Sequence, residues 1–374
     1  MKSPPARSSR RRQSRTSPMK PNPEMVILAR EFRELTQSDL ASAAGITQPR
    51  VARIEAGTGA DLTEAEMQAV AGALGFPVGF FGLAEQRFSY GSSSVFTRSR
   101  QLKAGERRKI SGLVNVLRIH VKRMLDHVDV QQVRPLPRLS IDDYGSAGAC
   151  ARALRVAWNL PNGPVRNLTR LLEGAGVMVI ECDFGGVPMD ATCIQFAELP
   201  PIIFIDKSVP GDRWRFTLAH ELAHLVMHDL PHPSMEDEAD DFASEFLVPS
   251  DEISPNLSRQ SASKLATYMP LKEYWQVSIA MLVRKSLTLG KIDENQRKWL
   301  IIQMNKLGIR KVEPLPIPRE QPTLFPSLIK HFREELGFTA EELGAALMYL
   351  PERLDELYAD VGQERARPQL RIVR

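Results

Sequence analysis

The stretch Phe216–His232 has the sequence His220-Glu221-Leu222-Ala223-His224 at its centre. Apolar residues surround these polar side chains, and neither Gly nor Pro interrupts the segment before Pro231, which predicts a buried helix. His220 and His224 would lie one turn apart on the same face, where both imidazole rings can reach one metal ion. The carboxylate of Glu221 is a candidate general base that takes a proton from the attacking water. The stretch therefore predicts the helix of a metal-dependent peptidase.

The same five residues also have a structural interpretation, in which an ordinary helix matches the pattern by chance. Buried His and Glu side chains are unfavourable unless they bind or pair with something, which argues for a site. Metzincin peptidases have a glycine and a third histidine after the helix, but Met227 and Leu230 hold the corresponding positions here. That class is excluded, and the third ligand must come from another segment.

The segment 236–249 is the next source of a ligand. Glu238 is the predicted third metal ligand, and Glu245, two turns further on, is the alternative. His228 and His232 could also bind metal, but we expect them at the surface or behind the ligands. The carboxylate cluster Glu236–Asp241 has its own interpretation, a solvated helix start that the helix dipole favours. The apolar residues of the segment recur at helical spacing: Ala239, Phe242, Ala243, Phe246 and Leu247.

The runs Phe216–His224 and Glu238–Pro249 resemble the ImmA/IrrE family of zinc metallopeptidases. The upstream segment Leu154–Pro164 and the downstream segment Leu271–Arg284 are similar to that family as well, so that the resemblance covers about half of the chain. The family resemblance implies a partner protein as substrate, typically a repressor or an antitoxin that is cleaved at one site.

The resemblance also implies roles for particular residues. Zinc would be bound by His220, His224 and Glu238, and Glu221 would be the general base. Two histidines and one glutamate suit several metals, so the ligand set leaves manganese open beside zinc.

A second informative block lies in residues 24–82. Thr36 with Asp39 forms a capping box at the start of a short helix. Gly45 can adopt the left-handed conformation of a tight turn, and Thr47 is placed to cap the next helix. Helix, short helix, glycine turn and a second helix with polar outer residues is the layout of a helix-turn-helix.

The run Leu35–Gly57 resembles the XRE (Cro-like) DNA-binding family along its whole length. The resemblance implies that Gln37 anchors a phosphate, that Gln48 and Arg50 read bases, and that Arg53 supports them. The alternative is a helical bundle that keeps the motif for contacts with protein. Acidic residues offset the arginines of this block, so a single copy would bind DNA weakly and a homodimer is expected on an operator.

Composition sets the class of protein. The chain has 374 residues, 43% of them hydrophobic, and no apolar run that could span a membrane. Its three cysteines, Cys150, Cys182 and Cys193, are widely spaced, which favours reduced thiols in a cytoplasmic protein. Residues 1–22 carry seven Lys and Arg and no acid, and this predicts a disordered tail. The tail could contact DNA phosphates, although a plain solvated leader is the favoured interpretation.

We therefore expect a multidomain, mainly α protein: an all-α helix-turn-helix domain, an α+β zincin-like metallopeptidase core and a helical C-terminal region. Three short β-branched runs near residues 177–181, 192–196 and 201–206 predict a small sheet whose edge could bind a substrate peptide. The expected boundaries are 1–22 for the basic tail, 23–82 for the DNA-binding domain and 83–130 for a linker with a connecting helix. They are 140–290 for the peptidase and 291–374 for the C-terminal module.

The leading hypothesis is a DNA-binding transcriptional regulator fused to a zinc endopeptidase. The alternative is an XRE-type regulator, or an antitoxin-like protein, whose peptidase-like domain only binds partners or senses a signal. A metal-stabilised scaffold is the weakest interpretation, because structural zinc sites prefer cysteine ligands.

Overall fold

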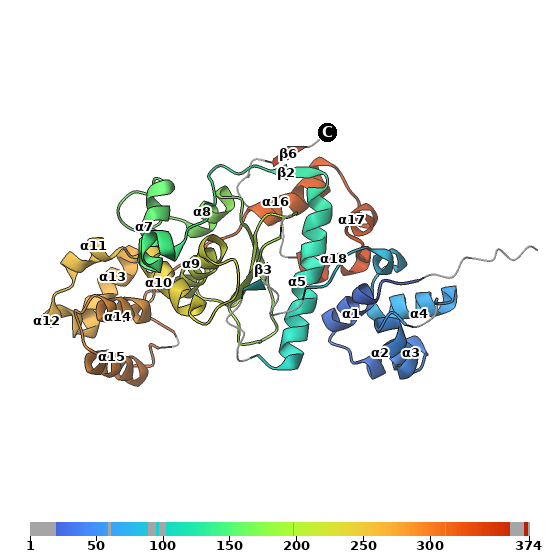
Figure 1. Cartoon of the computed structure of the whole chain (residues 1–374), viewed down its shortest axis with the longest axis horizontal. Coiled ribbons are helices and arrows are strands. Elements are labelled where there is room, and N and C mark those ends of the chain that lie inside the picture. Colours follow the sequence, from blue (N-terminus) through green and yellow to red (C-terminus); the bar gives the residue numbers. More distant parts are fainter. Residues whose placement is uncertain are drawn as a thin grey trace, which may run out of the picture.

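Helix α5 (Ala104–Leu125) stands between the N-terminal helices and a small sheet in the computed structural model (Figure 1). The structure describes residues 20–58, 61–88, 95–96, 102–196, 198–310, 312–359 and 370–372. The predicted basic tail lies outside these residues except for its last three positions. Among the described residues, no helix is both long enough and apolar enough to cross a membrane.

The N-terminal part has the predicted helix-turn-helix. Thr36 with Asp39 and Thr63 with Glu66 form capping boxes, and Gly45 ends the second helix at a φ of 64°. Thr47 precedes the third helix as expected, but its side chain makes no capping hydrogen bond. The elements are α1 (Pro23–Phe32), α2 (Gln37–Ala44), α3 (Gln48–Glu55), α4 (Glu64–Leu74) and the 3₁₀ helix η1 (Val78–Gly82).

The sheet has four strands in the order β1-β4-β5-β3. β3 (Met178–Cys182) is parallel to β5 (Ile202–Asp206), and β4 (Ala191–Ile194) is antiparallel to β5. The short β1 (Val95–Phe96) pairs with the outer edge of β4. The three runs predicted as strands are therefore confirmed as one sheet.

Alternation along the strands divides the sheet between two hydrophobic cores, since successive side chains point to opposite faces. On β3, Val179 belongs to the core of the peptidase part, whereas Met178 and Ile180 belong to the core shared with α5 and the N-terminal helices. On β5, Ile203 and Ile205 face the first core and Phe204 faces the second. The sheet is thus buried on both faces.

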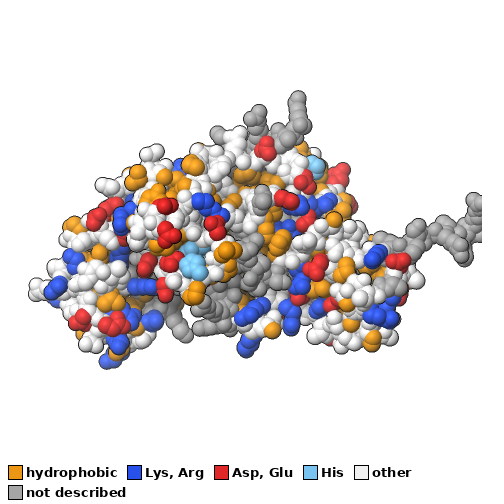
Figure 2. Space-filling model, in the orientation of Figure 1, with side chains coloured by type: hydrophobic (Ala, Val, Ile, Leu, Met, Phe, Trp, Pro, Cys, Tyr) orange, Lys and Arg blue, Asp and Glu red, His pale blue; other side chains and the backbone are white. Residues whose placement is uncertain are grey.

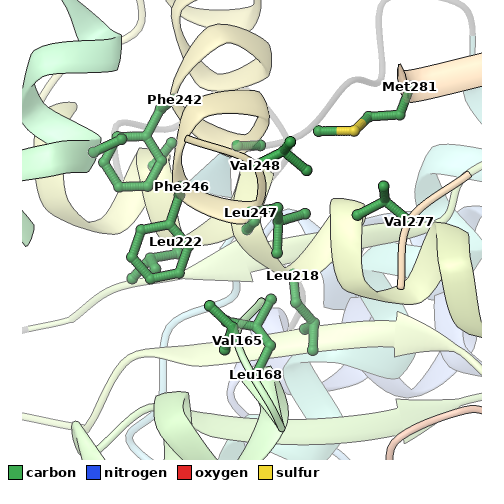
Figure 3. Packing of buried hydrophobic residues seen from close by; sticks show 14 of the residues in the cluster. Val165, Leu168, Leu218, Leu222, Phe242, Phe246, Leu247, Val248, Val277 and Met281 are labelled. Atoms are coloured by element: carbon green, nitrogen blue, oxygen red, sulfur yellow. The ribbon is translucent and has the colours of Figure 1, made fainter. Parts of the chain in front are cut away.

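The first core lies under the helices of the peptidase part. Leu218 and Leu222 of α9 meet Phe242, Phe246 and Leu247 of α10 (Figure 3). The helices that follow complete this side of the molecule. The α-helices are α6 (Ile141–Tyr144), α7 (Ala147–Ala157), α8 (Leu168–Gly174), α9 (Gly211–Met227), α10 (Met235–Leu247), α11 (Ser250–Ile253), α12 (Arg259–Ala262), α13 (Tyr268–Trp275), α14 (Ile279–Thr288) and α15 (Glu294–Lys306).

The C-terminal region does not form a separate body. Leu300 and Met304 of α15 lie in the peptidase core, whereas the later helices pack with α5 and the helix-turn-helix in the second core. These are α16 (Leu324–Lys330), a π-helical turn η5 (His331–Glu335), α17 (Ala340–Leu347) and α18 (Leu354–Tyr358). Near the end, β6 (Leu370–Ile372) pairs with β2 (Val128–Val130). Hydrophobic packing therefore groups α15 with the peptidase part and the later helices with α5, and the expected domain boundaries stay predictions.

Candidate metal centre and DNA-binding surface

Helix α9 carries the predicted histidine pair in its last turns. His220 and His224 are one turn apart, and their Nε2 atoms lie 3.1 Å from each other. Both rings are buried, because α9 packs between the sheet and α10. The helix therefore presents two imidazole nitrogens to one point, as its sequence predicts.

Helix α10 brings a carboxylate to the same point. Glu236 Oε2 lies 3.4 Å from His220 Nε2, and Glu236 Oε1 lies 3.8 Å from His224 Nε2. Four residues later, Asp240 Oδ1 contacts His220 Nδ1 at 2.9 Å, and Arg284 donates to the other oxygen of Asp240 at 2.8 Å. Asp240 thus fixes the ring of His220 with Nε2 turned to the cluster.

The donor set fits a zinc-type metal. With metal–nitrogen bonds of about 2.05 Å, two ligand atoms of a tetrahedral site are about 3.3 Å apart. The distances between the three side chains are near this value, and His220, His224 and Glu236 form a group that could hold a metal ion. In addition, each histidine uses its Nδ1 for a protein partner, which leaves the Nε2 lone pairs for a metal.

The structure does not bring Glu238 to this pair. Its Oε2 lies 3.1 Å from His228 Nε2, and it forms a separate group with His228 and His232. Two residues along a helix turn a side chain by about 200°, so Glu236 and Glu238 cannot both face His220. The carboxylate that the geometry offers as third ligand is therefore Glu236.

The other predicted alternative, Glu245, has a structural role. Its carboxylate pairs with Lys285 and Arg152 and accepts a hydrogen bond from the hydroxyl of Ser250. Burial raises the pKa of Glu245, but the bonds from Lys285 and Ser250 outweigh burial and hold that pKa below its usual range. Glu245 is thus kept ionised away from the histidine pair.

The charges around His220 favour a positive ring. Burial alone would lower its pKa, but the hydrogen bonds to Asp240 and Glu236 and the charge of Glu221 raise the pKa of His220 to about 9. A metal ion would have to displace this proton, so metal binding is expected to release protons.

Glu221 lies next to the cluster in a buried position with 3% of its surface exposed. Its backbone carbonyl contacts the thiol of Cys193 on β4, which ties this turn of α9 to the sheet. Burial and the negative charge of Glu221 raise the pKa of the Cys193 thiol well above its usual range. All three cysteines are free and buried, so the cluster is built from His and carboxylate groups.

A hydrogen-bonded relay leads away from His224. Its Nδ1 lies 2.8 Å from Nδ1 of His228, whose Nε2 faces Glu238. If His224 Nε2 is kept for a metal, its Nδ1 donates the hydrogen to His228, and His228 Nε2 donates to the carboxylate. Such a carboxylate–histidine chain orients a metal-binding ring.

Sequence reasoning missed Glu236, Asp240 and this relay. A signal was available: Glu236 and Asp240 are four residues apart, and an acidic pair at that spacing shares one face of a helix. The apolar stripe of α10 drew attention to Glu238 instead.

The predicted DNA-binding residues of the helix-turn-helix differ in exposure and in their partners. Gln48 and Arg53 are exposed at α3, and Gln48 donates to the side chain of Gln37, which in turn donates to Glu55. Arg50 instead pairs with Glu66 and donates to the carbonyl oxygen of Asp61. Gln37 and Gln48 thus meet at the surface, Arg53 is exposed further along α3, and Arg50 is engaged in holding α3 against α4.

Two family comparisons cover separate parts of the chain. Residues 28–81 match the helix-turn-helix family model, and residues 172–286 match the model for the IrrE N-terminal-like domain of peptidases. The search of curated proteins gave no significant match. The second match contains α9, α10 and the strands β3, β4 and β5, so it covers all three groups of the candidate metal centre.

Proposed function

We propose, from the premise that this chain carries an XRE-type helix-turn-helix domain and an IrrE/ImmA-like peptidase domain, that it is a DNA-binding regulator with a working zinc endopeptidase site. One observation carries the proposal: His220, His224 and Glu236 converge at the spacing of a tetrahedral metal site, with Glu221 next to the first histidine. A site used only for binding partners has no need of that buried carboxylate.

The residues have separate roles in this proposal. His220, His224 and Glu236 would hold zinc, which when bound polarises a scissile carbonyl and acidifies water. Glu221 takes a proton from the attacking water and delivers it to the leaving amine. Asp240, itself held by Arg284, keeps the ring of His220 in its binding orientation.

Substrate and DNA are the two proposed partners. The substrate would be a protein, a repressor or an antitoxin, as the family resemblance implies. A peptide could bind along the edge of β4 by taking the place of β1, whose Val95 and Phe96 pair there with Ile194 and Cys193. Gln48 and Arg53 would meet an operator, with Gln37 at a phosphate. The homodimer and the cytoplasmic location stay predictions.

The decisive experiment compares zinc content and cleavage in four proteins: wild type, Glu221→Gln, Glu236→Gln and Glu238→Gln. Each is equilibrated at low free zinc, analysed by mass spectrometry and incubated with candidate repressors. Wild type and Glu221→Gln should each hold about one zinc ion, because Glu221 is not a ligand. Glu221→Gln should cleave about 100-fold more slowly or worse, since it lacks the base.

The two glutamate variants test the ligand assignment. Glu236→Gln should lose the zinc ion and Glu238→Gln, a matched change two residues away, should keep it. Retention of zinc by Glu236→Gln would contradict the assignment. A wild-type protein that binds no zinc and cleaves none of the candidates would leave a DNA-binding regulator whose peptidase-like domain serves only to bind partners. A Glu221→Gln protein that cleaves at the wild-type rate would contradict the role of Glu221 as the base.

A further inference from the structure

Four histidines follow one another at intervals of four residues: His220, His224, His228 and His232. The first two belong to α9 and face Glu236. His228 ends that helix as its C-cap residue, with a φ of −111°, and His232 follows in the turn to α10. The change of direction at His228 separates the second pair of rings from the first and turns them towards Glu238.

The second group has the dimensions of a metal site. His228 Nε2 lies 3.1 Å from Glu238 Oε2, and His232 Nε2 lies 3.5 Å from the same oxygen. These distances bracket the separation of about 3.3 Å between ligand atoms around a tetrahedral zinc ion. His228 is buried, so its ring orientation is fixed before any ion arrives.

We propose that His228, His232 and Glu238 form a second divalent-metal site beside the peptidase centre. Two imidazoles and one carboxylate suit zinc and similar borderline metals, and water would complete the coordination. The proposal goes beyond the peptidase function and does not depend on it, because none of the three residues is assigned as a ligand of the first metal or as the base, although His228 and Glu238 also support the ring of His224.

An ion can reach this site from solvent. His232 is exposed on 40% of its side chain and Glu238 on 25%. Figure 2 shows histidine side chains open to the surface on this face of the molecule, with acidic side chains beside them. Negative charge at the entrance raises the local concentration of cations.

The two sites share the hydrogen bond between His224 and His228. When His224 Nε2 binds the first metal, its Nδ1–H points at Nδ1 of His228, and His228 carries its own hydrogen on Nε2. A second metal on His228 Nε2 must displace that hydrogen, which leaves as a proton to solvent and makes His228 an imidazolate, or else the hydrogen bond from His224 must break. Because either change is unfavourable, the second ion is expected to bind more weakly than the first. The sites should therefore fill one after the other as free zinc rises.

The test is a zinc titration of the full-length, metal-stripped protein, followed by equilibrium dialysis and mass spectrometry of bound metal. Wild type should take up two zinc ions per chain in two separate steps. His232→Asn and Glu238→Gln should each lose the weaker step and keep the tighter one. Glu236→Gln should lose the tighter step and keep the weaker one. A failure of the second site can therefore be distinguished from a failure of the peptidase site.

A matched control is His127→Asn, because His127 is an exposed histidine outside both groups. It should bind two zinc ions as wild type does. The proposal is overturned if wild type stops at one ion at saturating zinc, which would leave His228 and Glu238 as a hydrogen-bonded support of His224. It is also overturned if His232→Asn and Glu238→Gln both retain the second step. Far-ultraviolet circular dichroism checks that each variant is folded.

Discussion

At the residue scale, the side of a helix on which a carboxylate lies decides its role. Ala239, Phe242 and Phe246 define the buried stripe of α10. Glu236 lies on one flank of that stripe and Glu238 on the other, because each residue turns the helix by about 100°. Both flanks meet histidines, but different ones. Glu236 and Glu238 look equivalent in the sequence, but a substitution of Glu236 should empty the first metal site and a substitution of Glu238 the second.

A buried histidine outside the metal centre gives a residue-scale prediction about pH. His120 of α5 is fully buried and its Nδ1 is hydrogen-bonded with the hydroxyl of Tyr358. Burial, together with the charge of Arg123, lowers the pKa of His120 to about 3. In the unfolded chain a histidine pKa is about 6.5, so the unfolded state binds the proton more tightly.

The direction in which pH changes the stability follows from this difference in the pKa of His120. The contribution of His120 to stability is complete above pH 6.5 and is lost as pH falls from there towards 3. At pH 5 the loss should be about 2 kcal/mol. Urea unfolding at pH 7 and pH 5 measures it, and His120→Phe should remove this part of the pH dependence. An unchanged pH dependence in His120→Phe would refute the assignment, and exposed His127→Phe is the control.

At the element scale, α5 depends on one glycine for its contact with the DNA-binding domain. A Cβ atom on Gly112 would lie 2.6 Å from the backbone nitrogen of Phe32 and 2.9 Å from the carbonyl carbon of Glu31. These are backbone atoms of α1, which cannot move aside as a flexible side chain can. The two helices are thus packed at a distance that only glycine permits.

Gly112→Ala should therefore destabilise the protein. The clash is expected to cost about 1–3 kcal/mol, which exceeds the gain of about 1 kcal/mol in helix propensity. Gly105 lies in the first turn of the same helix with nothing within 4 Å of its Cβ position, so Gly105→Ala is the matched control and should be neutral or slightly stabilising. Chemical denaturation compares the two. Equal effects would contradict the close contact.

At the scale of the whole molecule, the C-terminal region joins the DNA-binding part to the rest. Tyr349 is 1% exposed and its ring packs against Phe76 and Phe32, with centroid distances of 5.4 and 6.4 Å. Its hydroxyl donates to Glu356 at 2.9 Å. The same ring contacts His120 of α5. One side chain thus connects three segments that are far apart in the sequence.

Tyr349→Ala should lower the stability of the helix-turn-helix as well as that of the C-terminal helices. Loss of a buried aromatic ring costs about 3–5 kcal/mol. Hydrogen exchange followed by mass spectrometry should show faster exchange in α1, α4 and α5 together. Tyr349→Phe keeps the ring and loses only the hydroxyl, so its effect should be about 1 kcal/mol. Faster exchange confined to α17 and α18 would show that the N-terminal domain is independent.

The sequence by itself determined the features that depend on neighbours along the chain. These are the histidine pair of α9, the capping boxes of α2 and α4, the glycine turn at Gly45 and the β-branched strands, because a helix turn, a cap and strand alternation are local geometry. Tertiary structure decided that Glu236 meets His220, that Arg50 is engaged with Glu66 and that the C-terminal helices pack on α5. Each depends on which flank of an amphipathic helix faces its neighbour, and packing of distant apolar residues sets that rotation.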